Sequence, residues 1–398
     1  MKFLQKNLLQ KNPHYVLVFG HLCSDINQGT LSAVLPFLVA AHNYDYATAA
    51  TLVMAANILN SLIQPFFGCI ADKHGRPYYM VIGIMLAGGG MSLTGLLDNF
   101  YGLCAALMIS GVGIAMFHPQ AAQLVNKYSD AQSKGAKMGI FSFGGNLGFT
   151  VGPILASASI AAFGLHGTLI FLLPPLLFAI VATLAFAGHR AEAATARTTH
   201  AAPEPQTENW GAFGRLSLLI ISRSIMYNGT NTFLVLYLVE AFALPKEFGN
   251  TFLSCYYAIT AFSALFGGKL ADAYGNRKIL RLSFGLYLPA IALFAVSQNL
   301  IFLLLLLLPM GMGIGLCYSP MVLLGQLYLP RHTGFASGVT LGLAVSIGGI
   351  VSPLLGKIGD AYGLGAIFWV LCALAVLPLT ISFLLPEPPA RTKTALEE

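Results

Sequence analysis

Long apolar blocks, each of about 18 residues or more, alternate with short polar segments along this chain. A block of that length crosses roughly 30 Å of hydrocarbon as an α-helix. Six blocks precede a polar gap and six follow it. The pattern predicts an all-α integral membrane protein with twelve transmembrane helices, near residues 14–41, 48–70, 78–97, 100–125, 136–163, 167–188, 213–241, 250–271, 279–297, 300–327, 334–358 and 365–386.

The two groups of six blocks are related by an internal repeat with an offset of 200 residues. The same offset recurs at several other positions, such as Gly29-Thr30 with Gly229-Thr230 and Pro153 with Pro353. Two related halves around a central axis are a recurring plan of secondary transporters. We therefore expect two pseudo-symmetric six-helix halves. The clearest copies are Gly68-Cys-Ile-Ala-Asp72-Lys-His-Gly75-Arg76 and Gly268-Lys-Leu-Ala-Asp272-Ala-Tyr-Gly275-Asn-Arg277-Lys278.

The polar gap indicates how the halves are joined. Residues 189–212 contain Ala, Thr, Pro, Glu and Arg without an apolar period, which is typical of a flexible linker. The predicted units are an N-terminal half at 1–188, a cytoplasmic linker at 189–212, and a C-terminal half at 213–398 that ends in a short polar tail.

Composition excludes a soluble protein. The chain is 56% hydrophobic and 9% charged, with a mean hydropathy of +0.73, whereas soluble domains carry about 25% charged residues. The distribution of Lys and Arg then orients the helices, because cytoplasmic loops are enriched in both. With both termini cytoplasmic, all of the 21 basic residues except Lys246, Lys357 and Arg223 lie on the cytoplasmic side or in its tails. We expect a multi-pass protein of the bacterial inner membrane.

Several functional classes have no support in the chain. The net charge of +6 follows from the loop bias and calls for no nucleic-acid partner. The six cysteines lie in or near apolar segments without CxxC spacing, and they are interpreted as packing residues. No phosphate loop, metal cluster or nucleophile triad is recognisable. We therefore expect no enzyme activity, no cofactor and no metal.

Two charged residues fall deep inside predicted helices. Asp25 lies about eleven residues into the first helix, and Arg223 about ten residues into the seventh, its repeat-mate. A charge at a helix centre costs on the order of 2.5–3.5 kcal/mol on insertion scales, so both are expected to face a central cavity and not lipid. The alternative is that they pair with each other and only hold the halves together.

Polar stripes accompany both charges at helical spacing. His21, Asp25, Gln28 and Ser32 share one face of the first helix, and Tyr227 follows Arg223 on the seventh. We interpret Asp25 as the proton carrier, with His21 and His118 as helpers, because histidine titrates near neutral pH. Arg223 would bind an anionic group of the substrate. Further candidate substrate-binding residues are Gln28, Tyr227, Asn228, Asn231, Asn146, Tyr318 and Tyr256.

Each of these side chains also has a structural interpretation. A lone histidine such as His118 is often a hydrogen-bond partner. Asn146 could satisfy a neighbouring helix, and tyrosines such as Tyr256 commonly pack or lie at the membrane interface. Glycine and proline in the fifth and eleventh helices are expected to allow close packing and bending. These helix-packing residues are Gly148, Gly152, Pro153 and Pro353.

The repeated Gly-x-x-x-Asp-x-x-Gly motif is interpreted as a conformational latch in the loops after the second and eighth helices. Its aspartate could accept hydrogen bonds from a neighbouring helix N-terminus. The alternative is an ordinary positively charged cytoplasmic turn. The latch residues are Gly68, Asp72, Gly75, Arg76, Gly268, Asp272, Gly275 and Arg277.

The loop pair, the six-plus-six layout and the Gly148-x-x-x-Gly152-Pro153 pattern resemble the major facilitator superfamily over the whole chain. Within it, three segments are similar to the fosmidomycin-resistance branch. The chain departs from the family at Pro77, where a second basic residue is usual, and at Gln120, where the branch can carry an acid. The resemblance implies an exporter working by alternating access. The three segments are His21-Leu-Cys-Ser-Asp25-Ile-Asn-Gln28, Gly113-Ile-Ala-Met-Phe117-His118-Pro119 and Phe141-Ser-Phe-Gly-Gly145-Asn146-Leu-Gly148.

The expected function is proton-coupled export of a small anionic compound or drug by a monomer in contact with membrane lipid. The first alternative is a proton symporter that imports a small carboxylate or similar nutrient, since the same residues would serve it. The second alternative is a non-transporting membrane receptor or scaffold. It would call for a long soluble domain, which this sequence does not indicate.

Overall fold

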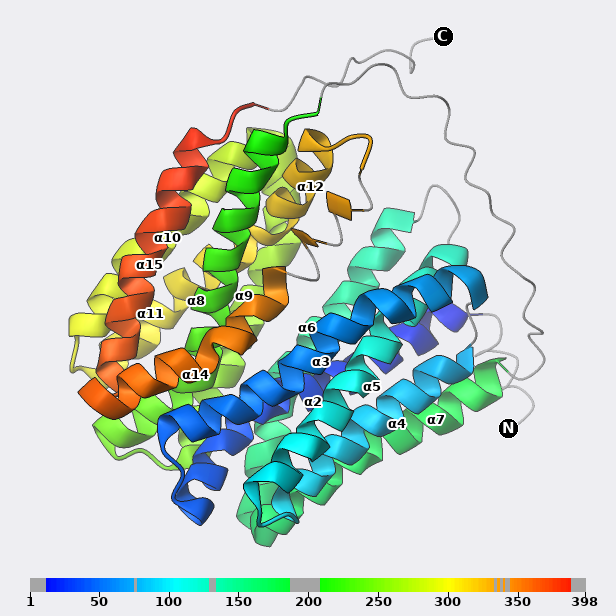
Figure 1. Ribbon diagram of the computed structural model, residues 1–398, viewed down its shortest axis with the longest axis vertical. Coiled ribbons are helices and arrows are strands. Elements are labelled where there is room, and N and C mark those ends of the chain that lie inside the picture. The colour runs from blue at the N-terminus through cyan, green and yellow to red at the C-terminus, as the bar shows by residue number, and fades with distance from the viewer. Residues whose placement is uncertain are drawn as a thin grey trace.

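The computed structural model describes residues 12–74, 77–128, 134–186, 208–332, 335–336, 339–340 and 344–387. Within these ranges the chain is helical and contains no strand, and the helices form two groups (Figure 1). The helices of the first group are α2 (Pro13–His42), α3 (Tyr46–His74), α4 (Pro77–Ser92) with η1 (Leu93–Gly95), α5 (Phe100–Lys127), α6 (Lys134–Phe163), and η2 (Gly164–Leu172) with α7 (Leu173–Phe186).

The second group repeats this plan, and the twelve predicted helices are confirmed. The predicted helix at 300–327 is divided at Cys317, and the start of the one at 334–358 lies partly outside the described residues. The helices of this group are α8 (Trp210–Phe242), α9 (Lys246–Tyr274), α10 (Asn276–Val296), α11 (Leu300–Leu316), α12 (Tyr318–Tyr328), α14 (Ala344–Tyr362) and α15 (Leu364–Leu384).

The boundary between the halves agrees with the linker only in part. Most of the predicted linker at 189–212 lies outside the described residues. Helix α8 begins at Trp210, inside the predicted linker range, and the Asn209 side chain accepts a hydrogen bond from the Ala212 amide at 2.9 Å. This cap satisfies an amide that the helix itself cannot bond.

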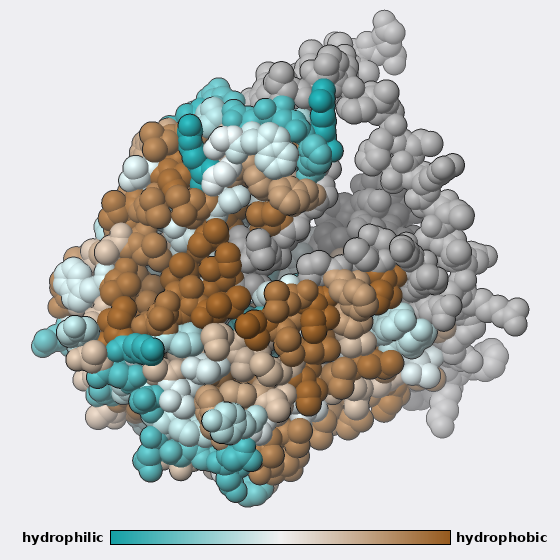
Figure 2. Space-filling view, viewed as in Figure 1, coloured by the Kyte–Doolittle hydropathy of each residue, from teal (hydrophilic) through white to brown (hydrophobic). Residues whose placement is uncertain are grey.

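The outer surface has the pattern that a bilayer requires. Figure 2 shows apolar side chains across the middle of the visible face and polar side chains toward its two ends. Large apolar residues such as Phe66, Ile180 and Leu305 are exposed. In the described residues, eight continuous helical stretches are long and apolar enough to span a membrane, and one of them, Gly139–Phe186, covers two predicted helices. Because helices satisfy their own backbone bonds, they tolerate this environment.

Glycines bring α6 against α2 at backbone distance. A Cβ added to Gly148 would lie 2.6 Å from the Leu22 carbonyl oxygen, and one added to Gly152 would lie 2.8 Å from that of Ile26. Pro153 lies inside α6, one residue beyond this face. Without a hydrophobic drive between helices in lipid, such close packing supplies much of their attraction.

The second half contains the same contact. Gly348 of α14, 200 residues after Gly148, packs against the Ser224 carbonyl of α8, the repeat-mate of α2. Its amide also donates to the Ser224 hydroxyl at 3.1 Å. Pro353 lies inside α14 as Pro153 lies inside α6. The repeat read from the sequence is therefore a repeat of packing as well as of residues.

Hydrogen bonds between the halves gather where α3 and α9 begin. The Asp360 carboxylate of α14 accepts from the Tyr46 and Ala47 amides at 2.7 and 2.9 Å and so caps the start of α3. The Asn250 amide of α9 donates to the Ala33 carbonyl at 3.0 Å. A carboxylate at a helix N-terminus satisfies free amides and complements the helix dipole. From this end the halves diverge in Figure 1.

The repeated aspartate motif begins inside helices. Helix α3 continues to His74 and α9 to Tyr274, so Gly68 and Gly268 are helical. The predicted helix ends near residues 70 and 271 are too early, and the loop position expected for Asp72 and Asp272 is wrong, because a helix can continue after its apolar run ends if nothing breaks it. In the second copy the break comes at Gly275, whose φ of 91° suits glycine.

The latch itself stays a prediction. Arg277 pairs with Glu387, beyond the last helix, at 3.1 Å between Nη1 and Oε1. Asp272 is exposed and forms no hydrogen bond or ion pair with any described residue. The Asp72 side chain, Gly75 and Arg76 lie outside the described part of the chain.

The glycine contact yields a direct test. We expect Gly148→Leu to lower the free energy of unfolding by at least about 1–3 kcal/mol, because its side chain would meet the α2 backbone. Gly89→Leu is the matched control, since nothing lies within 4 Å of a Cβ there. Apparent melting temperatures in detergent measure both, and equal values for the two variants would contradict the packing argument.

Candidate functional site

A carboxylate and two histidines form a cluster inside the first half. Asp25 of α2 is 4% exposed. Its Oδ2 lies 3.2 Å from Nε2 of His21, one turn earlier on the same helix. Its Oδ1 lies 2.9 Å from Nε2 of His118, which α5 supplies just before Pro119. The three predicted proton-coupling residues are therefore in direct contact.

Hydrogen-bond chemistry places a proton in this cluster. Nδ1 of His21 lies 2.8 Å from the Phe141 carbonyl oxygen, which can only accept, so Nδ1 carries a hydrogen. Nε2 of the same ring faces Asp25 Oδ2, and two lone pairs would repel each other. A second proton must therefore lie on that imidazole or on the carboxyl. The cluster is built to hold at least one exchangeable proton.

Glycine shapes the cluster as well as the helix contact. A Cβ added to Gly145 of α6 would lie 2.5 Å from both Asp25 Oδ2 and His21 Nε2. The His21 ring also stacks on Phe141 of α6, with ring centroids 4.1 Å apart. Helix α6 thus orients the histidine with a carbonyl and a ring, and it leaves room for the carboxylate by lacking a side chain.

The same three side chains have the donor types of a metal site. Their ligand atoms lie within 4.8 Å of one another, and among the described residues they are the one such group of three. Two imidazoles and one carboxylate suit several transition metals. The N···O contacts of 2.9 and 3.2 Å are hydrogen-bond distances, so protons account for the geometry without a metal.

Arg223 forms a second charged centre in the other half. It is 5% exposed on α8, and its Nε and Nη2 donate to the Ile314 carbonyl at 3.3 and 2.9 Å. The guanidinium carbon lies 5.5 and 5.6 Å from the ring centroids of Tyr227 and Tyr318. Cation–π attraction and a carbonyl stabilise the charge, yet no described carboxylate pairs with it.

Two tyrosines stand beside Arg223 on the side of Asp25. Tyr227 and Tyr318 flank the guanidinium, and both are within electrostatic range of the Asp25 carboxylate. The alternative of a direct Asp25–Arg223 ion pair receives no support, because Asp25 is engaged by the two histidines. Each charge is therefore compensated within its own half, Asp25 by the two histidines and Arg223 by the Ile314 carbonyl.

The other predicted substrate residues lie in different surroundings. Tyr256 is buried beside Tyr227, with ring centroids 6.5 Å apart, and its hydroxyl forms no hydrogen bond with a described residue. Asn231 is buried one turn after Tyr227. Asn228 donates to the Ser224 carbonyl of its own helix and lies against Gly348. The Asn146 side chain, partly exposed on α6, forms no hydrogen bond with a described residue.

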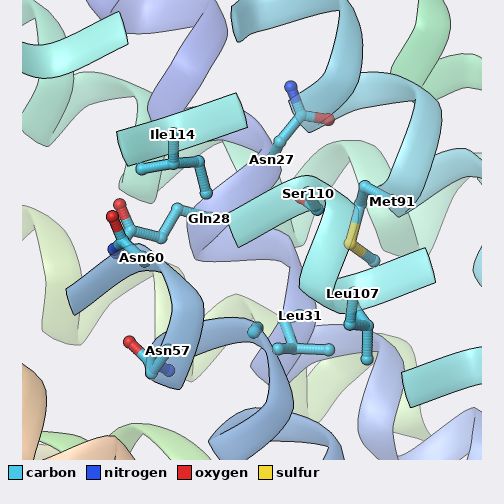
Figure 3. A pocket seen from close by; sticks show the side chains of 10 residues that line it. Asn27, Gln28, Leu31, Asn57, Asn60, Met91, Leu107, Ser110 and Ile114 are labelled. Atoms are coloured by element: carbon cyan, nitrogen blue, oxygen red, sulfur yellow. The ribbon is translucent and has the colours of Figure 1, made fainter. Parts of the chain in front are cut away.

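Gln28 lines a small cavity in the first half, and Arg223 is not among the residues that line it. The cavity holds about 30 Å³ and lies between α2, α3, α4 and α5 (Figure 3). Sequence reasoning missed its amide residues Asn27, Asn57 and Asn60. The signal for the last two was their spacing of three within the apolar segment 48–70, which places them on one helical face. The lining residues are Asn27, Gln28, Leu31, Ala56, Asn57, Asn60, Met91, Leu107, Ser110 and Ile114.

Comparison with known families decides what this architecture is. A model described as "Major Facilitator Superfamily" matches residues 17–353 and 216–398. This chain belongs to the Major Facilitator Superfamily. It is therefore a multi-pass membrane transporter of small molecules and not an enzyme, and the resemblance read from the sequence is confirmed.

Individual relatives agree with this assignment. The fosmidomycin resistance protein of Escherichia coli K12 is 25% identical over 375 residues, covering 92% of this chain and 90% of the relative. The quinolone resistance protein NorA of Staphylococcus aureus is 27% identical over 139 residues, covering 35% of this chain and 36% of NorA.

Solved structures share the fold. A bacterial homologue of the human lysosomal transporter Spinster superposes with a TM-score of 0.81 at 15% identity, covering 94% of this chain and 96% of that one. The nucleoside transporter NupG superposes with a TM-score of 0.73 at 14% identity, covering 94% of this chain and 100% of NupG.

Because no described carboxylate pairs with Arg223, its removal allows a test of stability. We expect Arg223→Met to leave the apparent melting temperature of the purified transporter nearly unchanged or raised. Methionine fills the volume without a buried charge, and the Ile314 carbonyl keeps the Cys317 thiol as a donor at 3.3 Å. A loss of about 3–5 kcal/mol, as expected on breaking a buried ion pair, would show that Arg223 holds the bundle together.

Proposed function

We propose that this transporter exports a small anionic compound in exchange for protons. The observation that carries the proposal is the buried cluster of His21, Asp25 and His118, whose contacts require a proton. A pH gradient can drive transport only through a group that binds a proton on one side and releases it on the other. Among the described residues, Asp25 is the acid buried within a helix interior; Asp360 and Glu240 lie near helix ends.

Arg223 supports an anionic substrate. It is a buried cation without a carboxylate partner in the described residues, flanked by two tyrosines that can also donate hydrogen bonds. A substrate carboxylate, phosphonate or phosphate would neutralise that charge and could accept a bidentate pair of hydrogen bonds. The Ile314 carbonyl, which now accepts from the guanidinium, would orient it.

The remaining features complete the proposal. The halves 1–188 and 213–398 would rock about the central site, joined by the cytoplasmic linker, in a monomer of the bacterial inner membrane with both termini cytoplasmic. The names of two relatives, for resistance to fosmidomycin and to quinolones, favour export and a role in antibiotic resistance. The latch motifs at Asp72 and Asp272 would then act on the cytoplasmic side.

Electrostatics favours the symport alternative in one respect. A proton on the cluster makes the centre more positive, and Asp25 acts on the same two tyrosines that flank Arg223. Coulomb's law alone would therefore favour simultaneous binding of proton and anion. Antiport requires the proton and the anion to compete for the transporter. They would compete if the anion could reach Arg223 only while the Asp25 carboxylate is charged.

Everted vesicles distinguish the two directions. With an acidic lumen, an antiporter accumulates its substrate inside the vesicle, whereas a symporter drives it out. Fosmidomycin and a panel of small carboxylates and phosphonates serve as first tracers. Cells that express the transporter are scored in parallel for resistance. Accumulation that is the same with and without the pH gradient for every tracer would exclude proton coupling.

The role of Asp25 is tested by Asp25→Asn. We expect this variant to lose pH-gradient-driven transport almost completely while substrate exchange without a gradient continues, because the amide keeps size and polarity but cannot exchange a proton. Asp98→Asn is the control, since Asp98 is exposed in a loop. Undiminished gradient-driven transport by Asp25→Asn would assign the proton to a histidine and overturn the role of Asp25.

The role of Arg223 is tested by Arg223→Gln. We expect affinity for the anionic tracer to fall roughly tenfold or more, since a charged hydrogen bond is worth about 1.5–3 kcal/mol. The response to the pH gradient should persist at saturating tracer. Arg215→Gln is the control, because Arg215 is exposed and, of the residues that the structure describes, it bonds the Leu384 carbonyl alone. Unchanged affinity in Arg223→Gln would place the anion elsewhere.

A further inference from the structure

The cavity between α2, α3, α4 and α5 is lined by neutral amides and contains no charged side chain. In Figure 3 the side chain of Gln28 reaches from α2 toward Asn60 of α3, and Asn57 lies one turn away on the same helix. Ser110 lines the opposite wall and donates its hydroxyl to the Ala87 carbonyl at 2.9 Å, so its oxygen can still accept.

Two amide oxygens in this lining have no hydrogen-bond partner in the described part of the chain. Asn27 is 1% exposed, and its Nδ2 donates to the Cys23 carbonyl at 2.8 Å, which identifies Oδ1 as the free atom. Asn60 is 8% exposed, and its Oδ1 is also buried without a partner. Buried polar groups without partners destabilise a fold, so their presence calls for a hydrogen-bond donor that enters the cavity.

The position of the cavity connects it to the transport path. Gln28 follows Asp25 by three residues and so lies on the same face of α2. Asn57 lies against Gly349 of α14, because a Cβ on that glycine would be 2.7 Å from the Asn57 amide. The lining therefore shares a helix face with Asp25 and reaches the contact between the halves.

We propose that this amide-lined cavity is a substrate subsite for an uncharged hydrogen-bond donor, a hydroxyl or primary amide. This rests on the proposed function, in which Arg223 holds the anionic group of the same molecule. The volume of about 30 Å³ admits a group the size of one or two water molecules. A charged group is excluded because the lining offers no counter-charge. The substrate class is thus a small hydroxylated or amidated anion.

The test compares two probes of equal charge, propylphosphonate and 3-hydroxypropylphosphonate. Their dissociation constants are measured by calorimetry on the full chain in nanodiscs, in potassium and then in sodium buffer. We expect the wild type to bind the hydroxylated probe about tenfold more tightly, as one added hydrogen bond allows. Asn60→Leu and Asn27→Leu should each reduce this preference to about twofold or less.

Ser61→Ala is the matched control, because the Ser61 hydroxyl bonds the backbone of its own helix at Asn57. It should keep the tenfold preference. Equal affinities of the two probes in the wild type would overturn the subsite, and so would binding of neither probe at millimolar concentration. A preference for the hydroxylated probe that persists in both leucine variants would also overturn the subsite. A preference that appears only in sodium buffer would overturn it too, because it would assign the amide oxygens to a bound cation.

Arg223→Gln separates this inference from the proposed function. If both hold, the variant weakens both probes alike and keeps the hydroxyl preference. If it changes neither affinity while Asn60→Leu still removes the preference, the subsite stands and the anion role of Arg223 fails. If the leucine variants have no effect while Arg223→Gln weakens both probes, the anion role stands and the subsite fails.

Discussion

The close approach of α2 and α6 is the contact on which the candidate site depends. Helices in lipid gain little from burying apolar side chains against each other, so backbone proximity has to hold them. Gly148 and Gly152 supply it along α6. Gly145 stands on the same face, and there the missing side chain makes room for Asp25 and His21. The packing surface and the proton cluster are therefore parts of one helix contact.

Charge is stabilised separately in each half. Two imidazoles surround Asp25 in the first half, and a carbonyl with two aromatic faces surrounds Arg223 in the second. Had the two paired, a buried ion pair would tie the halves together, and breaking it would be costly. With each charge compensated locally, the hydrogen bonds described between the halves gather near helix ends, as where Asp360 caps α3. That arrangement suits the proposed rocking of the two halves about a central site.

Much of the fold was predictable from local patterns. Helix positions follow from apolar length, because a bilayer imposes one dimension on every segment. The 200-residue offset between Gly148 and Gly348 predicted equivalent packing, and α6 with α2 and α14 with α8 show it. The loop assignment of Asp72 and Asp272 was wrong, because hydropathy marks where a membrane ends and not where a helix ends.

The sequence by itself determined the family plan, the depth of Asp25 and Arg223, and the polar face shared by His21 and Gln28. All of these depend on spacing along one helix. Only the tertiary structure decided that His118 bonds Asp25, that Arg223 stands apart from it, and that Asn27 and Asn60 share a cavity. Contacts between helices depend on their rotation and separation, which many side chains set together and no single periodicity records.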